Sequence, residues 1–347
     1  MRNFFLRPIL FCLVCLLLVS CGETEGVESA ASLAVQDSSR ESPETSSVGD
    51  IELSVEELSD IVLEESTPGE ESFPQAEELQ VLPLDILQVK INAKQAFVCD
   101  SAISSVFAKG NMDARLYPAS ITKLYTAYVA LQYVSPEEKI TAGDELSLVQ
   151  AGSSVAYIRK GHTLTAEMLV QGMLLPSGND AAYILAAAAG RAILENPSAA
   201  AREAVDAFVE AMNSHAAADG LTGTHFSVPD GFHEDDHYTT MRDLLKVAQL
   251  VSKNQLIMRY AGMQSARVVY ASGETNNWTN TNQLLNPASR YYRPQTLGLK
   301  TGHTSQAGYC LLTLEKRGDR LILVGVFGCS YSEGRFADTV SILESLA

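Results

Sequence analysis

Three short groups of residues in this chain combine side chains that together can carry out nucleophilic catalysis. They are Ser120-Ile-Thr-Lys123, Ser177-Gly-Asn179 and Lys300-Thr-Gly302, and they occur in this order along the sequence. A serine hydroxyl is a weak nucleophile until a neighbouring base removes its proton. Because Lys123 follows Ser120 by three positions, the two side chains share one face of a helix and can meet. The spacing therefore predicts a covalent mechanism with Ser120 as nucleophile and Lys123 as its base.

The sequence around these groups resembles the penicillin-binding D-alanyl-D-alanine carboxypeptidases, serine enzymes that remove the last D-alanine from peptidoglycan stem peptides. The resemblance covers nearly all of residues 90–347. It is carried by Tyr117-Pro-Ala-Ser-Ile-Thr-Lys123, Leu175-Pro-Ser-Gly-Asn-Asp-Ala-Ala182, the Gly231 to Tyr238 loop with His237-Tyr-Thr-Thr240, Asn280-Thr-Asn-Gln-Leu-Leu285, and Gly298-Leu-Lys-Thr-Gly-His-Thr304 followed by Ala-Gly-Tyr309.

The resemblance implies a role for each matching catalytic residue. Ser120 is expected to be acylated, with Lys123 as its base. Ser177 is expected to relay a proton to the leaving amine, and Asn179 to orient the reacting groups. Lys123 can act as a base only when it is neutral part of the time, and both burial and the nearby cation Lys300 favour that state.

The expected substrate-binding residues follow one another at Lys300, Thr301, Gly302 and His303. A free C-terminal carboxylate requires a cation, which Lys300 supplies beside Thr301. Gly302 has no side chain, so a substrate can approach the backbone there as an added strand. The negative oxygen of a tetrahedral intermediate needs preorganised donors, and we expect the backbone N–H groups of Ser120 and His303 to provide them.

The helix and strand patterns predict an α/β fold, in which an antiparallel five-stranded sheet is flanked by helices and carries an inserted all-helical lobe. The family resemblance implies a β-lactamase/transpeptidase-like architecture. Strands are expected at Gln95–Asp100, Ser105–Lys109, Arg267–Ala271, Thr296–Thr301, Tyr309–Glu315 and Arg320–Gly328. Helices are expected at Ser120–Val134, Thr165–Leu175, Asn179–Ala189 ending at Gly190, Ser198–Asp219, after Thr240, and at Phe336–Leu346.

The first 21 residues predict an export signal. Arg2 and Arg7 precede an apolar stretch at Ile9–Val19, which is too short to span a bilayer comfortably. Leu18-Val-Ser-Cys21 resembles a bacterial lipoprotein box, so Cys21 is expected to be the lipidated first residue of the mature protein. An ordinary cleaved signal with an incidental cysteine is the alternative. Many members of the family carry a C-terminal amphipathic anchor, and we expect the N-terminal lipid to replace it.

Charge separates the rest of the chain into two parts. Residues 22–80 carry 17 acidic residues and one basic residue, whereas residues 81–347 carry 25 acidic and 22 basic residues. The first part is poor in aromatic residues and cannot bury enough apolar surface to offset its ordering entropy. We expect a signal peptide at 1–21, a disordered acidic linker at 22–80 and a catalytic domain at 81–347, held by lipid at the outer face of the cytoplasmic membrane.

Three other functions match parts of the sequence less well. His233-Glu-Asp-Asp-His237 matches the His-Glu-x-x-His pattern of zinc peptidases, but that site requires both histidines on one helix, and the next helix is expected only at Thr240. A serine β-lactamase shares the first and third groups, yet the glutamate string that activates its water is absent between Ser177 and Lys300. A non-catalytic wall-binding protein predicts damaged motifs, and none is seen.

The expected partners are stem peptides ending in D-Ala-D-Ala, β-lactam antibiotics and, through the lipid, the membrane. No metal or organic cofactor is expected, and without a basic patch no nucleic acid either. Cys99, Cys310 and Cys329 lie in apolar, strand-like stretches typical of buried free cysteines, although the sequence leaves a disulfide between two of them open. Transfer of the acyl group to water or to an amine also stays open.

Overall fold

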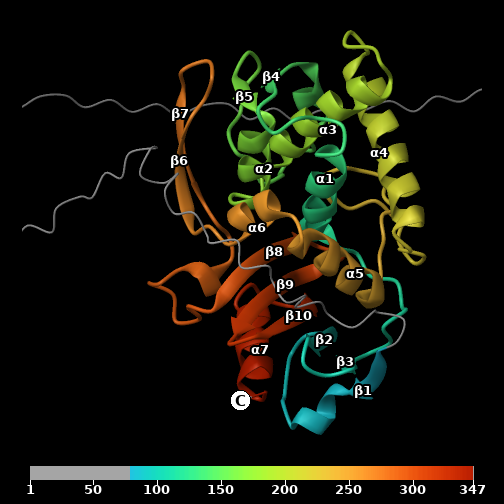
Figure 1. Ribbon diagram of the computed structural model, residues 1–347, viewed down its shortest axis with the longest axis vertical. Coiled ribbons are helices and arrows are strands. Elements are labelled where there is room, and N and C mark those ends of the chain that lie inside the picture. Colours follow the sequence, from blue (N-terminus) through green and yellow to red (C-terminus); the bar gives the residue numbers. More distant parts are fainter. Residues whose placement is uncertain (1–78, 347) are drawn as a thin grey trace, which may run out of the picture. The chain divides into compact units, whose positions relative to one another are not determined.

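A six-stranded sheet is the central element of the computed structural model, which describes residues 79–346 (Figure 1). Its strands follow the order β1 (Gln80–Pro83), β3 (Ser105–Lys109), β2 (Gln95–Asp100), β10 (Arg320–Cys329), β9 (Gly308–Arg317) and β8 (Thr296–Thr304). The predictions made for residues 1–78, including lipidation at Cys21, lie outside the described residues.

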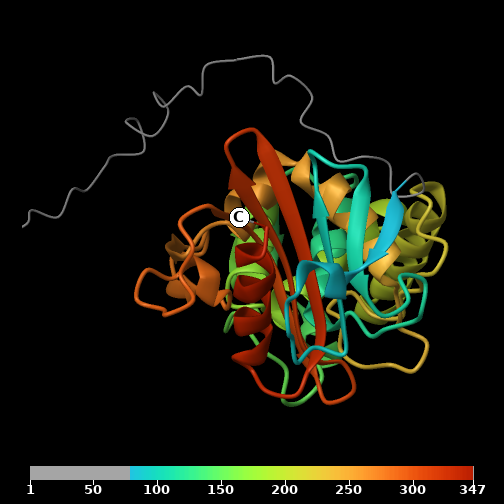
Figure 2. The same cartoon turned by 90° about the horizontal axis from the view of Figure 1, so that it is seen from below.

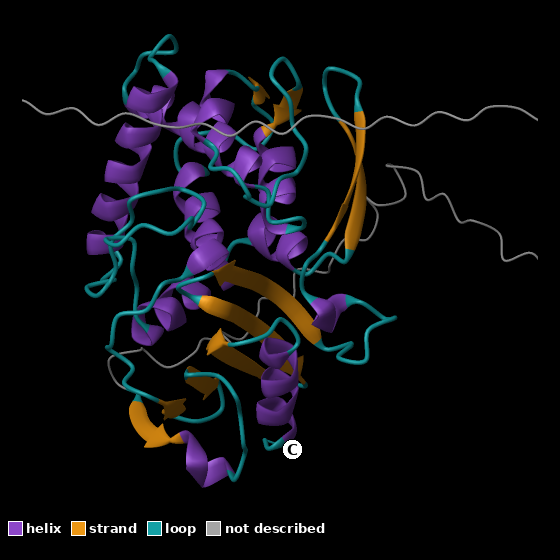
Figure 3. Ribbon diagram, turned by 180° about the vertical axis from the view of Figure 1, so that it is seen from behind, coloured by secondary structure: helices purple, strands orange, loops and turns teal. Residues whose placement is uncertain are grey.

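Seven α-helices accompany the sheet in residues 79–346: α1 (Thr122–Ala130), α2 (Ala166–Leu174), α3 (Asn179–Ile193), α4 (Ala201–Ala218), α5 (Met241–Ser252), α6 (Gln255–Ala261) and α7 (Gly334–Glu344). Four short 3-10 helices are η1 (Leu84–Leu87), η2 (Ala119–Ile121), η3 (Asp144–Leu148) and η4 (Gln283–Leu285). Two small hairpins complete this part of the chain, β4 (Lys139–Thr141) with β5 (Thr163–Thr165) and β6 (Ser265–Val269) with β7 (Thr275–Thr279). In Figure 3 the β6–β7 hairpin stands beside the helical lobe.

Five of the six predicted strands lie in this sheet and pair antiparallel, while the strand predicted at Arg267–Ala271 is β6 of a separate two-stranded sheet. A further strand makes the sheet six-stranded and corrects the expected count of five. This strand, β1, pairs in parallel with β3, with Gln80 opposite Ser105. It is only four residues long and ends in proline, so it lacks the alternating pattern that identifies a strand in sequence. It also lies where the acidic linker was expected to end.

Each face of the sheet packs against its own helices. On β10, Leu323 and Phe327 belong to the core shared with the helical lobe, whereas Ile322, Val324 and Val326 pack on the opposite face, together with Ile342 of α7. This is the alternation expected when both faces of a strand are covered. Figure 2 shows α7 on one side of the sheet and the lobe on the other. The inserted helical lobe is therefore confirmed.

Local signals place most helix starts correctly. The side chains of Thr165 and Thr240 accept hydrogen bonds from backbone N–H groups three residues later, as N-caps do. One predicted helix end is wrong, because α3 continues through Gly190 to Ile193. A Cβ atom at Gly190 would lie 1.8 Å from the carbonyl oxygen of Ala204, so this glycine permits close contact with α4.

Other expectations need smaller corrections. The helix expected at Ser120–Val134 starts as the 3-10 turn η2 and continues as α1 only to Ala130. The last helix starts two residues earlier than expected, and α6 and the β4–β5 hairpin were not foreseen. Cys99, Cys310 and Cys329 are all buried and free. Among residues 79–346, no helix combines the length and the apolar composition needed to cross a membrane.

Candidate active site

Ser120 and Lys123 lie where the chain leaves the sheet and enters the helical lobe. Ser120 is the middle residue of η2, and Lys123 lies in the first turn of α1. Lys123 Nζ donates a hydrogen bond to Ser120 Oγ over 2.7 Å. The contact predicted from the spacing of the two residues is confirmed, and it gives the hydroxyl a basic group within proton-transfer distance.

The Lys123 ammonium is fully enclosed by protein. Besides Ser120 Oγ, its Nζ has the backbone carbonyl of Asp230 as a partner, at 2.7 Å. Burial lowers the pKa of Lys123 to about 8, an effect that the nearby carboxyl groups of Asp230 and Asp180 partly oppose. With this pKa, about a tenth of the lysine is neutral at pH 7.

The loop that supplies the Asp230 carbonyl packs tightly against the nucleophile's turn. Gly231 has φ of +78°, and a Cβ atom there would lie 1.9 Å from the carbonyl oxygen of Ala119. Ala119 itself has φ of 48°, in the left-handed region. Only a residue without a side chain fits at position 231, so this glycine sets how closely the loop approaches Ser120.

Ser177 and Asn179 lie in the connection between α2 and α3. Ser177 has φ of 64°, and Gly178 has no room for a side chain because Ala156 Cβ would lie 2.7 Å from it. The backbone N–H of Asn179 donates to the carbonyl of Ser154 over 2.8 Å. The buried Oδ1 atom of Asn179 has no hydrogen-bond partner among the described residues.

The third group lies on β8, the edge strand of the sheet. A Cβ atom at Gly302 would lie 3.3 Å from the Ser120 backbone nitrogen, so the strand runs directly beside the nucleophile. Thr301 Oγ1 shares a hydrogen bond of 2.5 Å with Thr281 Oγ1. The exposed His303 ring stacks on Tyr309, with 4.0 Å between ring centroids.

Lys300 lies behind the wall of the cleft and does not line it. Its Nζ donates to the backbone carbonyl of Thr301 over 3.0 Å, and only 1% of the residue is exposed. Burial first, and then the charges of Lys123 and Arg335, lower its pKa well below the ordinary lysine value. The direct contact expected between Lys300 and a substrate carboxylate therefore stays a prediction.

Arg335 is a basic residue of the cleft that the sequence analysis missed. It lies in the first turn of α7, and its Nη1 donates to the carbonyl of Gly302 over 3.1 Å. Its Nε atom is buried without a hydrogen-bond partner within residues 79–346. No pattern links a lone arginine at a helix start to a strand 33 positions earlier, so only the packing of α7 on the sheet reveals it.

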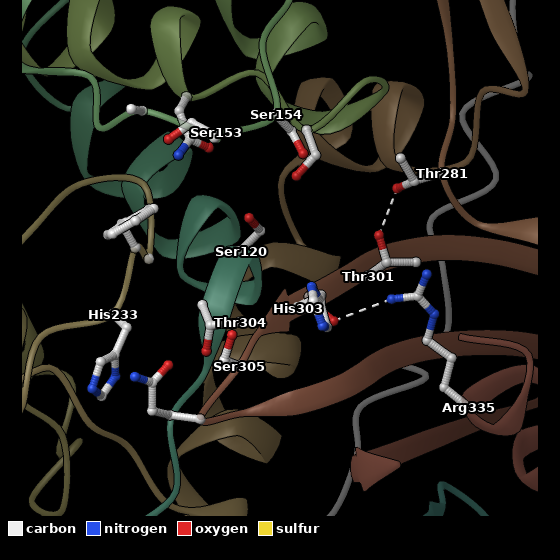
Figure 4. Close-up of a pocket in the computed structure, with 18 residues that line it drawn as sticks. Ser120, Ser153, Ser154, His233, Thr281, Thr301, His303, Thr304, Ser305 and Arg335 are labelled. Carbon is white, nitrogen blue, oxygen red and sulfur yellow. Dashed lines mark hydrogen bonds between the residues drawn. The ribbon is translucent and has the colours of Figure 1, made fainter. Parts of the chain in front are cut away.

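The side chains described above surround one cleft of about 520 Å³. Six of the eight predicted site residues line it: Ser120, Ser177, Asn179, Thr301, Gly302 and His303. Lys123 and Lys300 lie buried behind them. Figure 4 shows Ser120 between Ser153 and Ser154 on one side and the β8 residues on the other. No aspartate or glutamate is among the described residues that line the cleft.

The His-Glu-x-x-His string forms no helix, as the sequence analysis expected. His237 is buried, with Nε2 at 2.9 Å from Thr122 Oγ1 and Nδ1 accepting from the backbone N–H of Ser227. The ring of His233 packs edge-on against Tyr117. His233 lines the cleft, and its buried Nδ1 atom has no hydrogen-bond partner among the described residues. No group of three or more metal-binding side chains gathers within residues 79–346.

These contacts together suit acyl transfer. The cleft offers a hydroxyl bonded to a partly neutral amine, a second hydroxyl at Ser177, an amide at Asn179, and a guanidinium at Arg335 for an anion. A nucleophile, a base and charge-stabilising groups around one cavity are the parts that such a reaction requires.

The chain is similar in sequence to curated carboxypeptidases. A family model described as D-alanyl-D-alanine carboxypeptidase matches residues 85–330. Over 256 residues the chain is 28% identical to D-alanyl-D-alanine carboxypeptidase DacF of Bacillus subtilis, covering 73% of this chain and 61% of that protein. Over 240 residues it is 32% identical to the D-alanyl-D-alanine carboxypeptidase of Streptomyces sp. strain K15, covering 67% and 79%. DacA of Escherichia coli is 30% identical over 268 residues, covering 73% and 60%. The chain thus spans about three-fifths of the length of DacF and DacA.

The fold is similar to those of solved structures. The Streptomyces K15 DD-transpeptidase superposes with a TM-score of 0.65 at 28% identity, covering 74% of this chain and 97% of that one. Penicillin-Binding Protein D2 from Listeria monocytogenes, in its ampicillin-bound form, gives a TM-score of 0.59 at 26% identity, covering 74% and 97%. These similarities confirm the predicted transpeptidase-like architecture.

Proposed function

We propose, because this chain belongs to the D-alanyl-D-alanine carboxypeptidase family, that it removes the terminal D-Ala from peptidoglycan stem peptides through an acyl-enzyme. The observation that carries the proposal is the 2.7 Å hydrogen bond from Lys123 Nζ to Ser120 Oγ, made by a buried lysine with a pKa of about 8. Such a lysine is neutral often enough to act as a base. The proposed route uses neither a metal ion nor an organic cofactor.

In the acylation step, neutral Lys123 accepts the Ser120 proton while Oγ attacks the penultimate carbonyl carbon. The negative oxygen that forms is held by the backbone N–H groups of Ser120 and His303. The C–N bond to the terminal D-Ala then breaks, and a proton relayed through Ser177 converts the leaving group to a free amine. Water then attacks the ester carbonyl carbon while Lys123, neutral again, accepts a proton from it. The bond from this carbon to Ser120 Oγ breaks, Lys123 returns the proton to Oγ, and the shortened peptide leaves with a new carboxylate.

The substrate's terminal carboxylate is expected next to Thr301. Arg335 supports this position because it lines the cleft and already holds the Gly302 carbonyl. A guanidinium can bind a carboxylate through two parallel hydrogen bonds. Lys300, buried one residue before Thr301, contributes positive potential from behind when it is protonated.

The same nucleophile is expected to react with β-lactam antibiotics. A relative of this fold has been solved with ampicillin bound. The serine β-lactamases that release the opened drug rapidly use an added glutamate to activate water, and no carboxylate among the described residues lines this cleft. The acyl-enzyme is therefore expected to persist, which separates a carboxypeptidase from a β-lactamase.

Mass spectrometry of the intact protein tests this proposal. Brief exposure to benzylpenicillin is expected to add one drug mass at Ser120, and a pentapeptide ending in D-Ala-D-Ala is expected to lose one D-Ala. Ser120→Ala abolishes both results. Hydrolysis of many penicillin molecules per minute supports a β-lactamase instead. D-Ala release that survives Ser120→Ala and disappears with a chelator supports a zinc peptidase.

We also propose that the protein is exported and anchored through a lipid on Cys21, at the outer face of the cytoplasmic membrane. The support is the Leu-Val-Ser-Cys string after a short apolar stretch. Labelled palmitate is expected to enter the wild-type protein and not a Cys21→Ala variant in a bacterial host. Equal labelling of both proteins refutes the anchor.

A further inference from the structure

A second cavity adjoins the cleft at the end of the sheet where β2 begins and β10 ends. Its volume is about 340 Å³, and its wall includes two cations, Lys94 and Arg115. We call it the basic pocket. Gln306, which follows β8, lines both the basic pocket and the cleft that contains Ser120. The two cavities are therefore neighbours with one wall in common.

Arg115 is held in place by its surroundings. Its guanidinium carbon lies 3.8 Å from the centroid of the Tyr238 ring, a cation–π contact. The next residue, Leu116, exchanges two backbone hydrogen bonds with Thr239, of 2.8 and 2.9 Å. Backbone and side chain are thus both fixed to the same segment, so the cation needs little further ordering to bind an anion.

Lys94 faces the pocket from the other side. Its stem lies against Gly328, where a Cβ atom would come within 3.0 Å of Lys94 Cβ and Cδ. Among residues 79–346, neither Lys94 nor Arg115 makes an ion pair. Asp113, two positions before Arg115, is already paired with Arg242. Two unpaired cations around one cavity stand out in a domain whose net charge is slightly negative.

The basic pocket lies within reach of a peptide bound at Ser120. Arg115 precedes Ser120 by five positions, so their Cα atoms are at most about 18 Å apart. In an extended peptide, the second and third residues before the bond that breaks lie roughly 3–7 Å from the residue that carries the reacting carbonyl. A side group at that position can span the remaining distance.

We infer that the basic pocket binds a carboxylate in the acyl half of the substrate, two or three residues before the bond that breaks. The inference rests on the proposed function and adds a substrate preference to it. A stem peptide carries two candidates there, the α-carboxylate of its γ-linked D-glutamyl residue and the second carboxylate of a diamino acid at position three. Arg115 binds the group through charge-assisted hydrogen bonds, with Lys94 as a second cation.

Calorimetry with the full-length Ser120→Ala protein tests the inference. Four synthetic pentapeptides ending in D-Ala-D-Ala are titrated: one with both carboxylates free, two with one of them amidated, and one with both amidated. Amidation of the bound carboxylate is expected to weaken binding about tenfold, which identifies the group recognised. In a Ser120→Ala protein that also carries Arg115→Gln, the acid and amide peptides are expected to bind with the same affinity.

Arg290→Gln is the matched control, because Arg290 also packs on a tyrosine ring but lines neither cavity. It is expected to leave all four affinities unchanged. Equal binding of acid and amide peptides overturns the inference, as does an Arg115→Gln variant that weakens all peptides alike. D-Ala release by the wild-type enzyme is measured separately. Failure to release D-Ala refutes the proposed function, while calorimetry still decides the role of the pocket.

Discussion

Three basic side chains, those of Lys123, Lys300 and Arg335, lie buried near one serine hydroxyl. Burial lowers the pKa of each, and the Lys300 value is lowered further by the charges of the other two. Carboxyl groups at Asp180 and Asp230 oppose the effect on Lys123. The balance leaves Lys123 as an amine that changes protonation near physiological pH, which a serine nucleophile requires.

This balance predicts the pH dependence of acylation. The rate of reaction with benzylpenicillin is expected to rise about tenfold per pH unit below pH 8 and to level off above it, because the neutral fraction of Lys123 follows that curve. Stopped-flow measurement of acylation between pH 5.5 and about 9.5 checks this.

Lys123→Arg is expected to slow acylation about 10²–10⁴-fold and to remove the inflection near pH 8. Lys160→Arg, a change at an exposed ion pair with Asp144, is expected to alter neither. An inflection that persists in Lys123→Arg contradicts the assignment of the base.

The lowered pKa of Lys123 also affects the stability of the fold. Between pH 8 and 10.5 the unfolded chain holds the Lys123 proton and the folded chain does not, so the free energy of unfolding rises with pH in that window.

The Arg335→Gln substitution is expected to weaken binding of the substrate's terminal carboxylate. The KM for a peptide with a free C-terminus is expected to rise about tenfold, because a charged hydrogen-bond donor is lost from the cleft. A peptide with an amidated C-terminus should show little change, and Arg335→Lys should recover part of the loss. An equal effect on both peptides would assign Arg335 to support of Gly302 alone.

At the scale of elements, η2 is the point where the site is assembled. β8 contacts η2 on one side, where Gly302 lies close to the Ser120 backbone nitrogen, and the loop that contains Gly231 contacts it on another side. The approach at Gly231 requires the absence of a side chain, whereas a Cβ atom at Gly302 would be in tight contact, 3.0 Å from the Pro118 carbonyl oxygen. Ser120 is thus positioned by contacts between segments that are distant in sequence, rather than by its own helix alone.

Replacing Gly231 by alanine is expected to damage both stability and activity. The new Cβ would meet the Ala119 carbonyl at 1.9 Å, so η2 must shift. We expect the free energy of unfolding to fall by about 2 kcal/mol beyond the cost of the positive φ, and acylation by penicillin to become slower. Thermal unfolding and stopped-flow acylation measure the two effects.

Gly220→Ala is the matched control for this prediction. Gly220 has a similar φ of +72°, but the nearest atom to an added Cβ is Lys246 Nζ at 3.5 Å, an ordinary van der Waals distance. It should show only the cost of the backbone conformation. Equal losses for the two variants would mean that contact with η2 does not matter.

At the scale of the whole molecule, the sheet contributes to three hydrophobic clusters within residues 79–346, and ion pairs link its strands to neighbouring residues. Glu315 on β9 is buried and pairs with Arg293 and Arg317, at 2.6 and 2.7 Å. Burial alone raises the pKa of Glu315, but hydrogen bonds from the two arginines outweigh it and hold the pKa below its usual value. A carboxylate of this kind couples the stability of the fold to pH.

The sign of that coupling predicts acid sensitivity. As pH falls below about 4.5, the unfolded chain binds a proton at Glu315 before the folded chain does, so the free energy of unfolding decreases. Glu315→Gln is expected to lower the free energy of unfolding by about 3 kcal/mol at pH 7 and by clearly less at pH 3. Urea unfolding at both pH values measures this, with exposed Glu203→Gln as the control. A loss that is independent of pH contradicts the ion-pair account.

Local sequence patterns were sufficient to predict the contact between Ser120 and Lys123 and most of the helices and strands. Ser120 and Lys123 are three residues apart, Thr165 and Thr240 cap their own helices, and the β9–β10 hairpin joins neighbours in the chain. These features depend on interactions within a few residues, so the sequence displays them directly. The order of the three motifs then indicated the family.

Contacts between distant segments decided what the sequence could not show. Only the folded chain places Arg335 in the cleft, turns Lys300 inward, lets α3 pass through Gly190, and adds β1 to the sheet. Each of these depends on which surfaces pack together. The residues next to a position in the sequence do not indicate which residue that position contacts across the core. The sequence by itself therefore determined which polar groups lie close together along the chain, and tertiary packing determined that Arg335 lines the cleft while Lys300 lies buried behind it.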